Sequence, residues 1–116
     1  MSSRKRIVLL GAGLIGREHA ALLDRHPEAA LIAIADPSDA AAVVAEAFGA
    51  RHHADYRRML DEERPDGAII ALPNALHAQA AIACTERGIP CLLEKPIADT
   101  LEAAARIVEA SERSGV

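Results

Sequence analysis

Continuous apolar runs alternate with amphipathic stretches along the whole chain. The runs lack a regular polar alternation, as in strands that are buried on both faces of a sheet. We expect strands at residues 7–10, 30–35, 67–72 and 90–93, and at best a short one at 51–53. The intervals between them show the periodicity of helices that pack one face on a core. This pattern predicts right-handed crossovers and a parallel sheet.

Residues that start or stop helices stand at the expected borders. The first helix is expected over residues 13–26, with an inward face that carries Ile15, His19, Leu22 and Leu23. Polar N-caps predict the starts of the later helices at Ser38, Asp55, Asn74 and Asp99. Helix-ending residues follow at Pro27, Gly49, Pro65 and Gly88.

Five strands in this rhythm predict an α/β fold with the strand order 3-2-1-4-5. Such a sheet is a Rossmann-type, doubly wound parallel sheet in three αβα layers. The length of 116 residues favours one domain, residues 1–116. Ligands of such a fold bind beyond the carboxyl ends of the strands, where the strand order reverses.

The composition narrows the possible partners. Hydrophobic residues make up 51% and charged residues 26% of the chain, which is typical of a folded globular domain. The net charge is −4, and Phe48 and Tyr56 are the only aromatic residues on which a base could stack, which argues against a nucleic acid partner. The apolar runs are too short for a membrane helix or a signal peptide, so we expect no membrane contact and a cytoplasmic location.

A glycine-rich segment joins the first strand to the first helix. It reads Gly11-Ala-Gly13-Leu14-Ile15-Gly16 and matches G-x-G-x-x-G between a strand and a helix. Gly11 permits a tight turn, Gly13 lets a pyrophosphate approach the backbone, and Gly16 lets the helix pack close to the strand. The helix N-terminus offers free N–H groups and a partial positive charge to the phosphates. The segment predicts a dinucleotide site; an ordinary strand–helix turn is the alternative.

An acidic residue ends the second strand. Asp36 lies 20 residues after Gly16, where a carboxylate can accept hydrogen bonds from the ribose hydroxyls of the adenosine. The same charge would repel a 2′-phosphate, and no Lys or Arg stands at residues 37–45 to bind one. We therefore predict NAD as the cofactor, with NADP less favoured. The alternative is that Asp36 only caps a turn with Ser38.

Two further loops are expected on the cofactor side, after the fourth and fifth strands. Taken together, four segments resemble the N-terminal half of the glucose–fructose oxidoreductase / inositol dehydrogenase (Gfo/Idh/MocA) family. These segments are Gly11 to Gly16, Asp36, Pro73-Asn74-x-x-His77 and Glu94-Lys95-Pro96. The Glu-Lys-Pro triplet is the most specific of them, and the resemblance covers essentially the whole chain.

The resemblance implies a role for each residue of these loops. Leu72, Pro73 and Asn74 would border the nicotinamide half of the cofactor, with His77 beside them. Glu94 would contact the nicotinamide ribose. Lys95 would be catalytic, because an ammonium near the reacting carbon favours the alkoxide that develops as hydride leaves. For His77 a purely structural role is an equal alternative, and Glu94 with Lys95 could instead be a solvated surface pair.

The family places its general base and its substrate-binding residues in a second domain. The chain ends at Gly115-Val116, where another strand would follow, so we expect it to be truncated. The parent protein would be an NAD-dependent oxidoreductase that acts on a carbinol group of a sugar, polyol or derivative. The chain alone would bind dinucleotide without turnover. We also expect a homo-oligomer, because a fifth strand left at the sheet edge is exposed to pairing; the alternative is that the final helix covers this edge.

Two other readings of the chain remain open. It could be a non-catalytic NAD-binding sensor or regulatory module, or a fold relative that binds S-adenosylmethionine. For the remaining candidate residues we expect structural roles only. His19 is expected at the edge of the core, and Cys84 and Cys91 are expected to be buried free thiols. His52 and His53 are neighbours on a strand and point to opposite faces, so we expect no metal site.

Overall fold

The computed structural model describes residues 5–93, 108 and 115 of the chain, except for the side chains of residues 14, 15 and 74. The loop Glu94–Pro96 and the helix start expected at Asp99 lie outside these residues. Strands and helices alternate through the described part: β1 Lys5–Leu10, α1 Leu14–Arg25, β2 Ala29–Ala35, α2 Asp39–Ala47, β3 Arg51–His53, α3 Tyr56–Glu63, β4 Gly67–Ile70, η1 Asn74–Leu76, α4 His77–Glu86 and β5 Cys91–Leu93.

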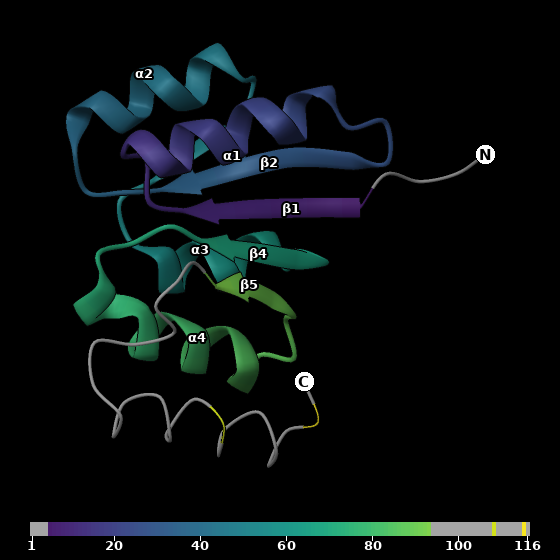
Figure 1. The fold of residues 1–116 in the computed structure, drawn as a ribbon, viewed down its shortest axis with the longest axis vertical. Coiled ribbons are helices and arrows are strands. Elements are labelled where there is room, and N and C mark those ends of the chain that lie inside the picture. The colour runs from purple at the N-terminus through teal and green to yellow at the C-terminus, as the bar shows by residue number, and fades with distance from the viewer. Residues whose placement is uncertain (1–4, 94–107, 109–114, 116) are drawn as a thin grey trace.

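The described strands form one five-stranded parallel sheet in the order β3-β2-β1-β4-β5, as the sequence predicted. Helices α1 and α2 cover one face of the sheet, and α3 and α4 cover the other (Figure 1). The order reverses between β1, which pairs with β2 on one side, and β4 on the other. This reversal is the switch point at which an open α/β sheet binds its ligands.

Two aliphatic cores lie on the two faces of the sheet. Successive side chains of β1 point to opposite faces, so Leu9 enters one core while Val8 and Leu10 enter the other. The core under α1 and α2 is rich in alanine, and the larger one under α3 and α4 contains Met59 and Leu60. Small residues at these positions let the helices lie close to the strands.

The helix borders follow the predicted signals with one exception. Asp55 is the N-cap of α3, and Gly49 and Gly88 have the positive φ angles of 68° and 70° that suit a helix-ending glycine. Asn74 does not cap α4 as predicted. The chain first makes the short 3₁₀ turn η1 from Asn74 to Leu76, and Leu76 occupies the N-cap position of α4.

The inward face of α1 differs from the predicted one. Leu22, expected to point inward, is 65% exposed. The buried positions are Gly16 and Ala20, with Leu23 half-buried, and these recur at i, i+4 and i+7. Gly16 decides this rotation because it is the residue that lies against the backbone of the preceding turn. None of the helices in the described part is long and apolar enough to cross a membrane.

Candidate functional site

The register of the sheet brings the ends of four strands to one edge. Leu10 pairs with both Ala35 and Ile70, and Ile70 pairs in turn with Leu93. These residues end β1, β2, β4 and β5, so the carboxyl ends of these four strands lie at the same edge of the sheet. The glycine segment, Asp36 and the loop after β4 therefore lie at one edge, and Glu94 follows directly after Leu93.

The glycine turn tolerates no side chain at two of its positions. Gly11 has a φ of +102°, and a Cβ there would lie 2.5 Å from the carbonyl oxygen of Ala71. A Cβ on Gly16 would lie 2.2 Å from the carbonyl oxygen of Gly11. Both neighbours are backbone atoms and cannot move aside. The two glycines thus hold the turn against β4 and hold α1 against the turn.

Gly13 lies in a different environment from Gly11 and Gly16. It is the N-cap of α1, and a Cβ there would meet nothing within 4 Å. Among the described side chains, none caps the start of α1, and its first turn contains no acidic residue. The first N–H groups of a helix have no acceptor within the helix. The start of α1 therefore presents free donors and positive potential, which suits an anion.

Asp36 is joined directly to the glycine turn. Its Oδ2 accepts a hydrogen bond from the N–H of Ala12 at 2.9 Å, and its Oδ1 accepts one from the N–H of Ser38 at 2.9 Å. Burial raises the pKa of Asp36, but these hydrogen bonds and nearby His52 outweigh it and hold the pKa below its ordinary value. The carboxylate is therefore charged and fixed at the carboxyl edge. The bond to Ser38 is the one expected if Asp36 caps a turn, whereas no sequence pattern predicted the bond to Ala12.

Two polar contacts around this turn carry no sequence signal. Nε2 of His52 lies 2.8 Å from the carbonyl oxygen of Asp36, and Nε of Arg17 donates to the carbonyl oxygen of Ala12 at 3.2 Å. His53, the next residue, bonds Glu63 instead, at 2.9 Å from Nε2 to Oε2. The two adjacent histidines thus diverge. No group of three or more metal-ligating side chains occurs among the described residues.

The loop after β4 is held by a buried histidine. His77 is 1% exposed, and its Nε2 lies 2.8 Å from the carbonyl oxygen of Leu72. Leu72 is half-buried, Pro73 is exposed, and the backbone of Asn74 begins η1. The ring of His77 therefore holds the start of this loop through the carbonyl oxygen of Leu72. Glu94 and Lys95 lie outside the described residues, so their contacts stay predictions.

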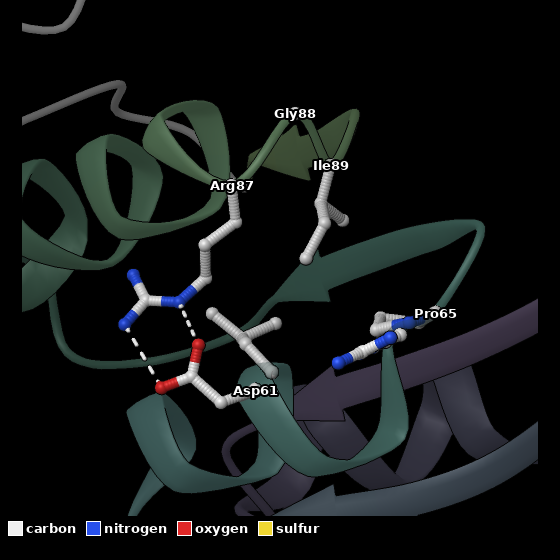
Figure 2. A pocket seen from close by; sticks show the side chains of 7 residues that line it. Asp61, Pro65, Arg87, Gly88 and Ile89 are labelled. Carbon is white, nitrogen blue, oxygen red and sulfur yellow. Dashed lines mark hydrogen bonds and ion pairs between the residues drawn. The ribbon is translucent and has the colours of Figure 1, made fainter.

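A separate hollow lies at the opposite, amino edge of the sheet. It has a volume of about 470 Å³ and lies between the end of α3 and the turn from α4 to β5. Figure 2 shows the guanidinium of Arg87 bonded to the carboxylate of Asp61 at one side of it, with Nε and Oδ1 2.7 Å apart. The residues predicted to bind cofactor do not line this hollow. Arg87 and Asp61 bond each other there, as in a structural ion pair.

The fold and the carboxyl edge together define a class of protein, the Rossmann dinucleotide-binding domains. The family model described as "Oxidoreductase family, NAD-binding Rossmann fold" (GFO_IDH_MocA) matches residues 5–116. The chain belongs to this family, as the resemblance of its motifs predicted.

Relatives and solved structures agree with this assignment. Inositol 2-dehydrogenase 2 of Saccharopolyspora erythraea is 38% identical over 112 residues, which are 94% of this chain and 33% of that protein. The WlbA dehydrogenase of Bordetella pertussis, solved in complex with NADH and UDP-GlcNAcA, is 32% identical with a TM-score of 0.92, over 100% of this chain and 36% of that one. The chain thus spans about a third of the length of the relatives that it matches.

A more distant solved structure shares the fold. Scyllo-inositol dehydrogenase from Lactobacillus casei, with bound NAD(H) and scyllo-inositol, is 22% identical with a TM-score of 0.91. It aligns with 97% of this chain and 34% of that one.

Proposed function

We propose that this chain is the NAD-binding part of an oxidoreductase that transfers hydride between NAD and a carbinol group of a sugar, polyol or derivative. The observation that carries the proposal is the open start of α1 beside a charged Asp36, joined by the hydrogen bond to Ala12. The match to a family of NAD-binding oxidoreductases supports the proposal, and so does the similarity to a solved structure at 32% identity that contains NADH. The substrate class rests on the names of the relatives, among them inositol dehydrogenases.

The diphosphate would rest on the N–H groups of residues 14–16, at the start of α1. Gly13 leaves open space there, and Arg17 in the second turn adds positive charge. The ribose of the adenosine would bind Asp36. The carboxylate of Asp36 accepts the N–H groups of Ala12 and Ser38 and the side chain of Ser38, and it keeps acceptor capacity for a ribose hydroxyl. Because the lowered pKa of Asp36 keeps its carboxylate charged, a 2′-phosphate would be repelled, which favours NAD over NADP.

On the nicotinamide side, Pro73, Asn74 and Glu94 would contact the cofactor, and Leu72 would border it. His77 would act as a positioning residue, because its ring already bonds the carbonyl oxygen of Leu72. When bound, NAD supplies the carbon that accepts hydride. Lys95 would stabilise the alkoxide and lower the pKa of a neighbouring base. With the general base placed in another domain, the isolated chain would bind cofactor without turnover.

Titration calorimetry of the purified chain with NAD, NADP and S-adenosylmethionine tests the binding site. We expect NAD to bind more tightly than NADP, and S-adenosylmethionine not to bind. Asp36→Asn should lower the affinity for NAD about tenfold. The affinity for NADP should fall less, because the substitution also removes the charge that repels a 2′-phosphate. Asp39→Asn, in the first turn of α2, is the matched control and should change neither affinity. An NADP preference in the unaltered chain would refute the role given to Asp36.

Steady-state kinetics of the whole parent protein test the catalytic assignment. Lys95→Met should lower kcat at least a hundredfold with inositols or related polyols and leave NAD affinity within a few-fold. Unchanged kcat would refute the role of Lys95. Absence of any dehydrogenase activity in the unaltered parent would favour the non-catalytic sensor instead. Sedimentation of the same protein would test the homo-oligomer that we propose.

A further inference from the structure

The chain contains two cysteines, and the fold brings them together on the face opposite α1. Cys84 lies on α4 and is buried in the core between the sheet and α3 and α4. Cys91 begins β5 and packs against the same core while staying partly accessible. The two thiols are free and form a side-chain hydrogen bond with each other. No cofactor contact proposed above uses either of them.

Backbone contacts fix this pairing. The N–H of Ile89 donates to the carbonyl oxygen of Cys84 at 2.9 Å, which closes the turn after α4. Gly88, with its φ of 70°, lets the chain reverse there. Cys91 then enters the sheet opposite Ala68 of β4. Helix α4 and strand β5 lie side by side as a result (Figure 1), and both sulfurs face the same core.

The two thiols differ in character. The hydrogen bond from Cys84 outweighs burial and lowers the pKa of Cys91 to about 7. Donating that bond, together with burial, raises the pKa of Cys84 well above its ordinary value. Cys91 is also the thiol that solvent can reach, whereas Cys84 is buried, so Cys91 is the group that an oxidant meets first. A thiolate attacks oxidants and a neighbouring thiol resolves the product, so the pair has one group for each step.

We propose that Cys84 and Cys91 are a redox modification site that forms a reversible intrachain disulfide when a hydroperoxide oxidises Cys91. The Cys91 thiolate attacks the terminal oxygen of the peroxide, the O–O bond breaks, and Cys91 becomes a sulfenic acid while the leaving oxygen takes up a proton. The sulfur of Cys84 then attacks the sulfur of Cys91. The S–O bond breaks, the hydroxide leaves with the proton of Cys84 as water, and an S–S bond forms. Two thiols are oxidised, and one peroxide is reduced to water or to an alcohol and water.

The proposal goes beyond cofactor binding, because neither thiol needs NAD to react. The product would join α4, whose first residue His77 holds the loop after β4, to β5, which leads to Glu94. The disulfide would thus tie together the supports of two loops at the carboxyl edge. A dithiol reductant would reverse it by thiol–disulfide exchange.

Intact mass spectrometry of the purified 116-residue chain tests the site, since the chain has no other cysteine. The folded chain is treated with hydrogen peroxide, then unfolded and alkylated with a maleimide. We expect both thiols to be lost together, a monomer about 2 Da lighter than the reduced chain, and full recovery of both thiols after dithiothreitol. Retention of both thiols at peroxide doses that oxidise Cys91 in the variant below would overturn the proposal.

Two single variants assign the order of events. In Cys84→Ala, Cys91 should stop at the sulfenic acid and be trapped by dimedone. In Cys91→Ser, Cys84 should remain a thiol at the same dose. Equal reactivity of the two cysteines, or disulfides that form only between chains, would refute the pairing. The urea-unfolded chain is the control in which the fold no longer aligns the thiols, and it should lose them more slowly. The comparison of the folded with the urea-unfolded wild-type chain tests the proposal even where a variant folds poorly.

Discussion

Helices α1 and α3 begin in opposite ways. At α3, the carboxylate of Asp55 accepts the N–H of Arg57 at 2.9 Å and caps the helix with the protein's own atoms. At α1, the N-cap is Gly13, and none of the described side chains takes the first N–H groups. The far end of α3 is secured as well, because Glu63 bonds Arg51 and His53 on β3. One helix is fastened by side chains at both ends, and the other is open at its start.

Within the described part of the chain, helices α2 and α4 also lack a side-chain cap, so it is the position of α1 at the switch point that makes its open start suited to a ligand. A capped N-terminus gains about 1 kcal/mol relative to an apolar cap, and its donors are no longer free. An uncapped start forgoes part of that stability and keeps its donors for an anion. In this chain the open start lies at the switch point of the sheet, whereas α3 begins at β3 on the sheet edge. Four substitutions, in order of decreasing effect, test the contrast.

Replacing Gly16 with alanine should have the largest effect. Its Cβ would lie 2.2 Å from the carbonyl oxygen of Gly11, so the turn or the helix must shift. We expect a loss of about 3 kcal/mol in the free energy of unfolding, measured by urea denaturation. Gly13→Ala is the matched control, because its Cβ meets nothing within 4 Å, and it should change stability by less than about 0.5 kcal/mol. Equal losses from the two variants would show that the turn does not need close packing at Gly16.

Glu63→Gln removes the charged group that fastens the end of α3. Its hydrogen bonds from Arg51, followed by those with His53, outweigh burial and lower the pKa of Glu63 from 4.5 to about 2. A depressed carboxyl pKa stabilises the fold above its ordinary pKa, and the contribution is lost as the pH falls through the folded pKa. We expect the variant to be about 2 kcal/mol less stable at pH 7, after allowance for the exposure of Arg51. Urea denaturation should show this gap closing between pH 4.5 and pH 2. A gap that does not depend on pH would rule out the ionised pair as its source.

Gly13→Asp gives α1 the kind of cap that α3 has. The backbone of Gly13 is already extended, with φ −74° and ψ −167°, and there is room for the side chain. The free chain should gain a few tenths of a kcal/mol in stability. NAD affinity should fall about tenfold, because the carboxylate occupies the donors and repels the diphosphate. Gly13→Asn is the uncharged control and should lose less affinity. Calorimetry that finds NAD binding intact in Gly13→Asp would place the diphosphate elsewhere.

Asp55→Ala has the smallest expected effect. It removes the cap of α3 and should cost about 1 kcal/mol in thermal or urea unfolding. NAD affinity should stay unchanged, because β3 and α3 lie away from the switch point. A marked fall in NAD affinity would mean that the two helix starts are coupled and that the contrast between them is too simple.

The sequence predicted the fold because its signals are local and agree with each other. Strand order, crossovers and the positions of Gly11 and Gly16 follow from periodicity and a spaced motif. The inward face of α1 was predicted wrongly through Leu22, since the periodicity was followed through the large apolar residues, whereas the small Ala20 faces the sheet together with Gly16. A helix packed this closely on its own turn buries its smallest residues and turns a leucine to the surface.

The contacts of the site were less predictable than the residues that make them. The position of Asp36 could be read from its distance to Gly16, but its bond to Ala12 depends on how the ends of two strands meet in space. The same holds for His52 on the carbonyl oxygen of Asp36 and for the thiol pair. These contacts depend on how neighbouring elements meet in space, even where the two residues are as near in sequence as Cys84 and Cys91, and no spacing rule encodes them.

The bond between Asp36 and Ala12 has a consequence for engineering the cofactor preference. The same carboxylate that would select the adenosine sugar also braces the glycine turn before any cofactor arrives. An exchange aimed at accepting NADP, such as Asp36→Ser, would therefore remove a brace along with a repulsive charge. The success of such a variant would depend on a new acceptor for the N–H of Ala12. A redesign therefore has to treat the glycine turn and the loop after β2 as one unit.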